Sequence, residues 1–579
     1  MTASYGRALA LLCMVSLVAC GGGGDGAGTP APGASQPPAT QPPAASPAPT
    51  VSVSAAPGTV TAGGSTLLTW SSGNASSCAA TVAWSGAKAT SGSQTINSIS
   101  ATSTYTLTCT GSGGSTTRSV IVSVTAAGTG VSGAVDSSLL SRHQESANLV
   151  YAFGGFNTTS GAPVATATVT QDAGACTFRY ALAGLPNGSY TIALTSDGGT
   201  SFIRSANVTV SGAAVQNFAP ASVVRVGPGR PFSHPNQVTG LASGDVVEID
   251  AGVYADAVKT WSTSNLTLRG VGGRAHLVAP ASISNGKAIW VMQGTNQAVE
   301  NIEFSGAAVP DKNGAGVRAE GRDLAICGSY LHDNENGILG PDAGGGNMLV
   351  EYSEFARNGG CVNGFGCSHN MYIGNTERFT LRHSYSHHAR IGHTVKSRAQ
   401  ENRILYNRIM DEADGTSSYT IDLPNGGLSY IVGNLLQQGP STDNSTILNY
   451  GAEGLSNPNR TLHVVNNTLV NDLGSGTFID IAAGATATVR NNLFVGSGTA
   501  IRGTATQATN QTTSSPAFVD RAGFDYRPTA STPGIDAGTA PGLAGTFDLT
   551  PVYQYVHPAN REARPTRNAI DIGAYEFVP

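Results

Sequence analysis

Charge is scarce in this chain. Of its 579 residues, 12% are Asp, Glu, Lys or Arg, against roughly 25% in a typical soluble domain. The net charge of −5 gives no broad basic field of the kind that nucleic acid requires, so nucleic acid is not expected as a partner. An anionic polymer would need a local basic patch.

Long apolar runs are also scarce, and the clearest is short and lies at the N-terminus. The run of residues 8–18 follows Arg7 and ends in Leu17-Val18-Ala19-Cys20, which predicts a secretory signal and not a membrane span. This tetrad resembles the lipobox of bacterial lipoproteins. The resemblance implies that residues 1–20 are a lipoprotein signal peptide and that Cys20 is lipidated. Gly21 after the cysteine favours the outer membrane, with the chain facing the periplasm or the cell surface.

Residues 21–50 are almost uncharged and rich in Pro, Gly and Ala. They predict a disordered tether.

The cysteines show no CxxC spacing typical of zinc sites. Export to an oxidising compartment favours disulfides, and the pairs Cys78–Cys109 and Cys361–Cys367 each lie within one predicted domain or loop. Cys176 and Cys327 are either buried thiols or a long-range bridge.

Two small β-sandwich domains are predicted before the main part of the chain. Residues 51–127 alternate apolar and polar residues, and Trp70, Trp84 and an inter-sheet Cys78–Cys109 bond would form the core. This stretch resembles bacterial immunoglobulin-like modules through STYTLTCTGS. Residues 128–222 resemble the carboxypeptidase regulatory-type sandwich through FRYALAGLPNGSYTIALTS. Inert spacers are the favoured interpretation of both, with carbohydrate binding as the alternative.

Residues 223–579 repeat. Short strands that mostly begin with Asn or Ser recur at intervals of 23 to 33 residues, starting at 301, 329, 353, 384, 407, 434, 467 and 492. A repeat of this length without helical periodicity predicts an all-β chain whose largest part is a right-handed parallel β-helix, in which stacked Asn side chains satisfy backbone groups at the turns. A pair of large sandwiches is the alternative. The segments GDVVEIDAGVY, LTLRGVGG and IDIGAYEF resemble those of β-helix proteins.

Residues 369–425 hold five of the eleven histidines, a Lys-Ser-Arg strand and, in Asp422, an Asp whose apolar neighbours suggest burial. Alternation along the strands predicts outward side chains that repeat at a step of 26 residues: Asn370 to Lys396, Tyr372 to Arg398, and Lys396 to Asp422. Neighbouring rungs lie about 4.8 Å apart, so these groups would form a ladder on one face. Asn449 and Glu453 would extend it.

The strand Val395-Lys396-Ser397 resembles the Lys-bearing strand of the chondroitinase B and alginate lyase family. That resemblance implies a polysaccharide lyase with Lys396 as the base. The following rung departs from the family, because Asp422 stands where the family has an Arg, so the family's second residue cannot be transferred.

β-Elimination of a uronate polymer requires a cation at the carboxylate, a base for the C5 proton and an acid for the leaving oxygen. The hypothesis assigns Arg398, or a Ca²⁺ near Asp422, to the carboxylate. Lys396 is the base, with His393 as substitute, and Tyr372, Tyr419 or a histidine is the acid. Expected substrate-binding residues are His369, Asn370, Tyr419, Asp422 and Asn449. Beyond the possible Ca²⁺ no cofactor is expected, and the chain is expected to act as a monomer.

Two other functions stay open. A β-helix glycoside hydrolase would use two carboxylates, with Asp422 and one of Asp411, Glu412 or Asp414 as the nearby acids. A non-catalytic surface lipoprotein that binds polysaccharide is the other.

Overall fold

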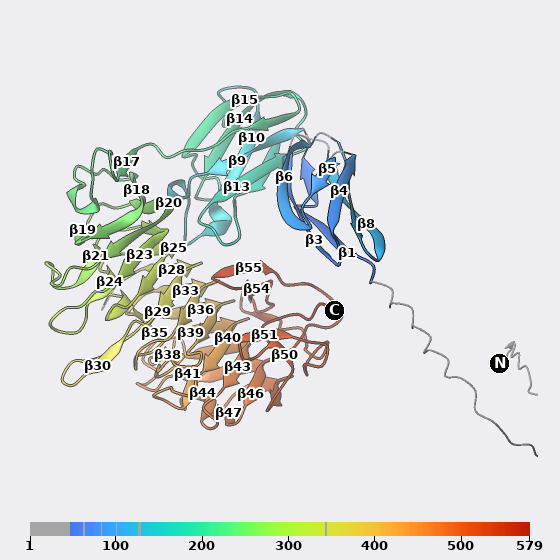
Figure 1. Ribbon diagram of the computed structural model, residues 1–579. Coiled ribbons are helices and arrows are strands. Elements are labelled where there is room, and N and C mark those ends of the chain that lie inside the picture. The colour runs from blue at the N-terminus through green and yellow to red at the C-terminus, as the bar shows by residue number, and fades with distance from the viewer. Residues whose placement is uncertain (1–46, 62–63, 83, 100, 126–128, 342–343) are drawn as a thin grey trace, which may run out of the picture. The chain divides into compact units, whose positions relative to one another are not determined.

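The computed structural model describes residues 47–61, 64–82, 84–99, 101–125, 129–341 and 344–579 (Figure 1). Cys20 and most of the predicted tether lie outside these residues. The chain divides into two compact units, residues 1–126 and 127–579. Within the described residues no helix is long and apolar enough to cross a membrane, and the helical segments are three single 3-10 turns at Ser137–Leu139, Glu145–Ala147 and Pro235–Gln237.

The first unit contains two sheets around one apolar core, which includes Trp70, Trp84 and Leu107. One sheet has the order β1 (Thr50–Ala56), β3 (Gly64–Gly73), β6 (Ser91–Ile99). The other has the order β2 (Thr59–Thr61), β8 (Gly114–Thr125), β7 (Ser103–Gly111), β4 (Ser77–Val82), β5 (Gly86–Lys88).

The Cys78–Cys109 bond forms as predicted, but the prediction that it joins two sheets is wrong. Cys78 on β4 and Cys109 on β7 are directly opposite each other in one antiparallel pair. The two sulfurs are therefore brought together by strand register and not by packing of sheet on sheet.

The second unit begins with two four-stranded sheets. One contains β11 (Ala165–Thr168), β10 (Leu149–Gly154), β14 (Gly188–Thr195) and β15 (Arg204–Val210), and the other β12 (Thr170–Gln171), β13 (Phe178–Ala183), β9 (Gly130–Val135) and β16 (Ala213–Val215). A Cys176–Cys327 disulfide ties this module to the strands that follow, so the long-range bridge is the correct alternative. A buried Arg142–Glu300 ion pair joins the same two parts.

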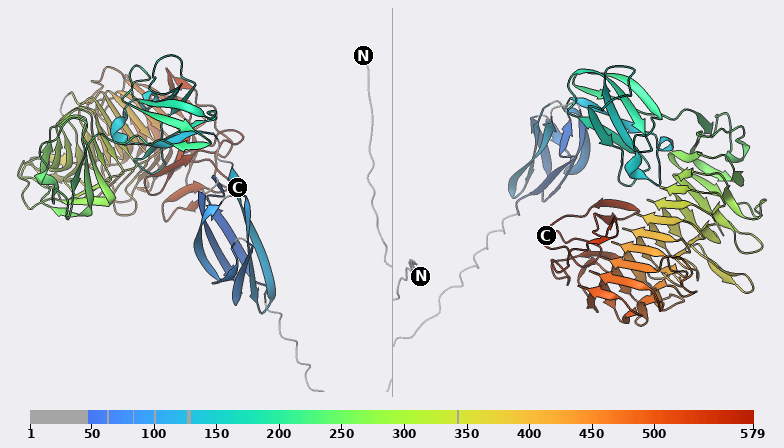
Figure 2. Two further views of the ribbon diagram at one scale, coloured as in Figure 1. Left: turned by 90° about the horizontal axis from the view of Figure 1, so that it is seen from above. Right: turned by 180° about the vertical axis from the view of Figure 1, so that it is seen from behind.

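The rest of the second unit is a stack of parallel rungs (Figures 1 and 2). Each full rung contributes one strand to a ten-stranded parallel sheet, here called the site sheet, and two strands to a larger parallel sheet. The site sheet contains β19 (Lys259–Trp261), β21 (Ala288–Met292), β24 (Ala315–Ala319), β27 (Asn336–Leu339), β32 (Met371–Ile373), β35 (Val395–Ser397), β38 (Ile421–Leu423), β41 (Thr446–Tyr450), β44 (Thr477–Ile481) and β47 (Thr499–Arg502).

The larger sheet runs in two rows after β17 (Val223–Val226), β18 (Val246–Ala255) and β20 (Thr267–Val278). The first row contains β22 (Gln297–Glu300), β25 (Leu324–Cys327), β28 (Asn347–Glu351), β33 (Arg378–Arg382), β36 (Glu401–Leu405), β39 (Leu428–Val432), β42 (Thr461–Val465), β45 (Thr486–Arg490) and β48 (Thr506–Ala508). The second row contains β23 (Ile302–Ser305), β26 (Tyr330–His332), β29 (Glu354–Ala356), β34 (Tyr385–His387), β37 (Arg408–Met410), β40 (Leu435–Gln438), β43 (Thr468–Asn471), β46 (Leu493–Gly496) and β49 (Gln511–Thr513). The predicted all-β chain with a parallel β-helix is confirmed, and each of the eight predicted repeat strands is found in the second row.

A ladder of inward-pointing Ser and Asn side chains runs along the corner between the two rows. The backbone N–H of Asn407 donates to Asn434 Oδ1 at 2.9 Å, and that of Asn434 donates to Asn467 Oδ1 at 2.9 Å. The same contact recurs through Ser329, Ser353, Ser384, Asn492 and Asn510. Each rung thus satisfies a buried donor of the rung before it, as predicted.

The outer side of the β-helix is partly covered. Residues of the C-terminal segment, among them Tyr526, Tyr555 and Tyr575, pack on Met410, Leu435, Val470 and other residues of the second row. This segment contains the short strands β50 (Phe518–Asp520), β51 (Asp525–Pro528), β52 (Leu543–Ala544), β53 (Phe547–Asp548), β54 (Tyr553–Val556) and β55 (Asn560–Ala563). A hairpin of β30 (Gly360–Val362) and β31 (Gly366–Ser368) carries the predicted Cys361–Cys367 disulfide.

Candidate functional site

One column of side chains follows the outward face of the site sheet. Core residues such as Ile373, Val395 and Ile421 alternate with it and are fully buried. Strand register places the members of the column directly opposite one another on successive rungs. In order they are Val291, Arg318, Leu339, Tyr372, Lys396, Asp422, Asn449, Asp480 and Arg502.

The constant step of 26 residues is correct for one pair only. Lys396 lies opposite Asp422 as predicted, but Tyr372, and not Asn370, lies opposite Lys396. Tyr372 is therefore not opposite Arg398. The two rungs differ in length because the later one carries a longer loop before β38, so a step counted on one rung does not hold for the next.

The predicted outward orientation of Asn370 is wrong. Its side chain is fully buried, accepts from the backbone N–H of Asn358 at 3.0 Å and donates to the carbonyl of His387 at 2.9 Å. Asn370 lies next to β32 and not in its outward column, and it ends a second corner ladder formed with Asn334 and Asn358. It holds the rungs together and is not placed to bind substrate.

Lys396 lies between two carboxylates. Its Nζ is 3.5 Å from Asp422 Oδ2 on the next rung and 3.2 Å from Glu453 Oε1 in the loop after β41. Asp422 is almost fully buried, and burial raises its pKa even though Lys396 and a 2.5 Å hydrogen bond from Asn449 oppose that rise. A buried carboxyl with a raised pKa is well suited to exchange a proton with its neighbour.

Arg398 follows β35 and connects three partners. Its Nε donates to Tyr372 Oη at 2.8 Å, one terminal nitrogen donates to Glu453 Oε2 at 2.7 Å, and the other donates to Asn425 Oδ1. Burial opposes its charge, but the hydrogen bonds with Tyr372 and Glu453 raise its pKa. The carboxylate of Glu453 therefore bridges Lys396 and Arg398. Partial burial favours its neutral form, yet these two cations lower its pKa.

His369 and His393 stack beside this cluster with ring centroids 4.6 Å apart. The backbone N–H of His393 donates to His369 Nδ1 at 2.8 Å, and that of Tyr419 donates to His393 Nδ1 at 3.2 Å. When neutral, each ring then carries its proton on Nε2, and His393 Nε2 lies 3.4 Å from Asp422 Oδ2. This tautomer makes His393 a donor toward Asp422 and does not suit the predicted substitute base.

Burial is the main cause of the lowered pKa values of His369 and His393. It lowers the pKa of His369, and burial together with the charge of Lys396 lowers the pKa of His393 to about 3. Both rings are therefore neutral at neutral pH, and neither can supply a second proton to a leaving oxygen.

Asp422 does not suit the Ca²⁺ that the sequence left open. Its oxygens face a Lys ammonium, a His Nε2 and an Asn amide nitrogen, whereas Ca²⁺ takes six or more oxygen ligands. The acids considered as partners of Asp422 in a hydrolase are engaged elsewhere. Asp411 is fully buried and accepts from the backbone of Ser417 and Gly439, and Glu412 pairs with Arg408.

The structure brings Tyr372, His369, His393, Lys396, Arg398, Tyr419, Asp422 and Asn449 into one connected group, and Asn370 is the predicted site residue that turns inward. Glu453, which the sequence suggested only as an extension of the ladder, is central. It comes from a loop, where alternation cannot say which way a side chain points. The alternation of side chains along the strands could therefore not identify Glu453 as a central residue.

Comparison with known proteins finds similarity in structure but none in sequence. No family model and no curated protein matches this sequence. Among solved structures, "Crystal structure of pectate lyase Pel9A" is 15% identical with a TM-score of 0.46, and the match covers 62% of this chain and 97% of that one. "Geobacillus virus E2 - ORF18" is 14% identical with a TM-score of 0.27 over 48% of this chain and 54% of that one. At these identities and TM-scores neither match carries a conclusion about chemistry.

The buried histidines predict acid sensitivity. His393 has a folded-state pKa of about 3 against the ordinary value of 6.5, so the unfolded chain takes up a proton below about pH 6.5 that the folded chain does not. Its contribution to stability is complete above that pH and is lost as the pH falls, at about 1.4 kcal/mol per pH unit. The substitution His393→Asn keeps an acceptor for the Tyr419 N–H but removes the titrating ring. Between about pH 6 and pH 4.5, the free energy of unfolding measured with urea should therefore fall less steeply in this variant than in the unaltered chain. An equal slope in both proteins would contradict this account.

Proposed function

We propose that this protein is a polysaccharide lyase that cleaves a uronate-containing polymer by β-elimination, with Tyr372, Lys396 and Arg398 as its centre. The observation that supports it best is the position of Glu453, whose two oxygens lie 3.2 Å from Lys396 Nζ and 2.7 Å from an Arg398 nitrogen. A uronate carboxylate has the same charge and the same paired oxygens. The two cations therefore form a binding place for that group, which Glu453 occupies in the absence of substrate.

Arg398 holds the substrate carboxylate during the reaction. Its guanidinium stays charged in proteins, and neutralising the carboxylate lowers the cost of developing negative charge on the adjacent C5 carbon. Asn425 and Tyr372 hold the guanidinium in place.

Lys396 acts as the base after passing a proton to Asp422. The two groups are 3.5 Å apart, and burial raises the pKa of Asp422, so the Asp422 carboxylate accepts a proton more readily than an exposed carboxylate does. The amine takes the C5 proton, the C4–O bond breaks and a C4=C5 double bond forms. Asn449 and His393 keep Asp422 in place.

Tyr372 donates the proton to the leaving oxygen. Because Tyr372 Oη accepts a hydrogen bond from Arg398 at 2.8 Å, its own O–H remains able to donate to substrate. The nearby guanidinium stabilises the phenolate that results. Solvent then protonates Tyr372 while Asp422 releases the proton it accepted, which restores the ion pair of Lys396 and Asp422.

Removal of these groups should slow elimination strongly. We expect Lys396→Met and Tyr372→Phe each to lower the rate by about 10²- to 10⁴-fold, the usual contribution of acid–base catalysis. Lys88→Met in β5 of the first unit is the control. The measurement is ultraviolet absorbance of unsaturated products from alginate, pectate, glycosaminoglycans and bacterial acidic polysaccharides. Full activity of Lys396→Met on a cleaved polymer would contradict the assignment.

A glycoside hydrolase is the second candidate, and one observation favours it. Asp422 and Glu453 both contact Lys396 Nζ, and their pKa values are displaced in opposite directions, upward for buried Asp422 and downward for Glu453. Such a divergence suits one general acid and one ionised carboxylate.

Glu453→Gln separates the two candidates. A lyase with this substitution keeps its elimination rate and binds the substrate carboxylate more tightly, since the competing charge is gone, so KM should fall several-fold. A hydrolase would lose activity by about 10²-fold or more. Glu320→Gln, which alters another ion-paired carboxylate next to β24, is the matched control. A new double bond in the products together with a raised KM would argue against Glu453 as a substitute for the substrate carboxylate.

We further propose that Cys20 carries a lipid that holds the enzyme at the outer membrane, where an acidic polysaccharide is its partner. The Leu17-Val18-Ala19-Cys20 sequence supports the anchor. The chain made in a bacterial host should partition into the detergent phase of a phase-separation assay, and Cys20→Ser should move it to the aqueous phase. Aqueous partition of both would contradict the anchor.

A further inference from the structure

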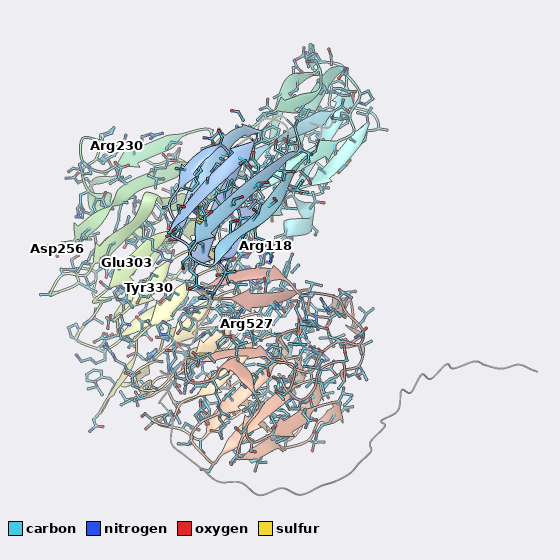
Figure 3. All side chains as sticks on the ribbon, turned by 45° about the vertical axis from the view of Figure 1, so that its right-hand side comes forward. Arg118, Arg230, Asp256, Glu303, Tyr330 and Arg527 are labelled. Atoms are coloured by element: carbon cyan, nitrogen blue, oxygen red, sulfur yellow. A yellow bond between two sulfur atoms is a disulfide. The ribbon has the colours of Figure 1, made fainter. Side chains whose placement is uncertain are left out.

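A second group of titratable side chains lies on the larger sheet, away from the column of the site sheet. His276 on β20 is directly opposite Glu303 on β23, and Glu303 is opposite Tyr330 on β26, two residues before His332. Ala275, Leu277, Phe304 and Leu331 between them are fully buried, so alternation turns His276, Glu303 and His332 outward. Glu303 and Tyr330 are labelled in Figure 3.

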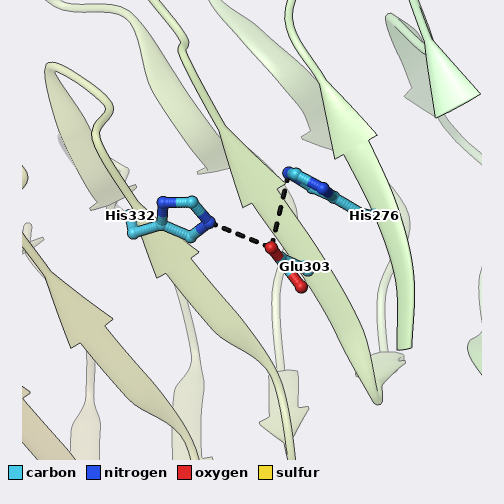
Figure 4. Close-up of side chains that lie close together, drawn as sticks. All are labelled: His276, Glu303 and His332. Carbon is cyan, nitrogen blue, oxygen red and sulfur yellow. Dashed lines mark hydrogen bonds and ion pairs between the residues drawn. The ribbon is translucent and has the colours of Figure 1, made fainter. Parts of the chain in front are cut away.

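Both imidazole rings turn toward the same carboxylate oxygen (Figure 4). His332 Nε2 lies 3.1 Å from Glu303 Oε1, and His276 Nε2 lies 3.5 Å from it. The three ligand atoms all lie within 4.8 Å of one another, and the three residues are half-buried. Ligand atoms around a tetrahedral Zn²⁺ with bonds near 2.1 Å are separated by about 3.4 Å, and the two contacts with Glu303 Oε1 lie close to that spacing.

The surroundings of His332 are those of a metal ligand. Its Nδ1 lies 2.7 Å from Asp333 Oδ2, and Asp333 is held by Arg357 at 2.9 Å and Arg390 at 2.5 Å. A proton on Nδ1 shared with an ionised carboxylate leaves the lone pair of Nε2 free for a metal. Such carboxylate–histidine pairs are typical of the outer shell of zinc sites.

His276 Nε2 has a second neighbour besides Glu303. Ser305 Oγ is 2.8 Å from His276 Nε2. It would yield that nitrogen to the ion and could then bind water on the remaining coordination position.

We propose that His276, Glu303 and His332 bind a divalent transition-metal ion, best matched by Zn²⁺, with a fourth position left to water. Two imidazoles and one carboxylate are a known three-ligand set for Zn²⁺. The ligands come from three successive rungs, so the ion links the early rungs of the β-helix. The site is independent of the proposed lyase centre, because its residues belong to another sheet.

The test is metal binding by the full chain after removal of metal with a chelator. Titration calorimetry with Zn²⁺ should give one equivalent of tight binding, and Co²⁺ should give a visible spectrum of low coordination number. Glu303→Gln, which preserves shape, and His332→Gln should each weaken Zn²⁺ binding at least 100-fold. Asp333→Asn, which leaves the ligands intact, should weaken it 10- to 100-fold.

His463→Gln, a half-buried histidine on β42, is the control and should bind as the unaltered chain does. Thermal unfolding with and without Zn²⁺ reports whether each variant folds, and Zn²⁺ should raise the melting temperature of the unaltered chain but not of Glu303→Gln. The proposal is overturned by the absence of stoichiometric binding. It is equally overturned if Glu303→Gln binds Zn²⁺ as the unaltered chain does.

Discussion

The hydrogen bond from each rung's corner N–H to the Ser or Asn side chain of the next rung is the contact on which the rest of the β-helix depends. It fixes the axial register of successive rungs while satisfying donors that are buried away from water. Once register is fixed, an outward residue has a defined neighbour about 4.8 Å away on either side. The cluster around Lys396 and the cluster of His276, Glu303 and His332 both depend on this stacking, because the residues of each come from different rungs and are distant in sequence.

The candidate site is balanced in charge and tightly filled. Lys396 and Arg398 face Asp422 and Glu453, and Lys396 has little exposure. An unpaired ammonium in such a place would be costly. We propose that this site admits an anionic sugar, and that requires a carboxylate able to leave when the substrate arrives. Glu453 meets that need, since it lies in a loop and is the most exposed member of the group.

Much of the fold follows from the sequence. The Asn- and Ser-led strands reveal the repeat, and alternation correctly places Lys396 opposite Asp422. The error for Asn370 and Tyr372 has a physical cause: rungs differ in loop length, and a residue beside a strand can turn inward to a corner ladder. Glu453 was expected only as an extension of the ladder, and its central position could not be predicted because loops have no alternation. The sequence analysis did not identify the cluster of His276, Glu303 and His332. These residues lie on three different rungs, whereas the histidines and charged residues of 369–425 are close together in sequence.

We propose that Lys396 and Arg398 act on a uronate by elimination. The most direct measurement is mass spectrometry of the products formed from a cleaved polymer in water with isotopically heavy oxygen. Each cut by elimination should give one unsaturated fragment that lacks one water relative to its hydrolysis counterpart, and the reaction should add no heavy oxygen to either fragment. Addition of one heavy oxygen per cut, at the new reducing end, would contradict elimination and assign the site to hydrolysis.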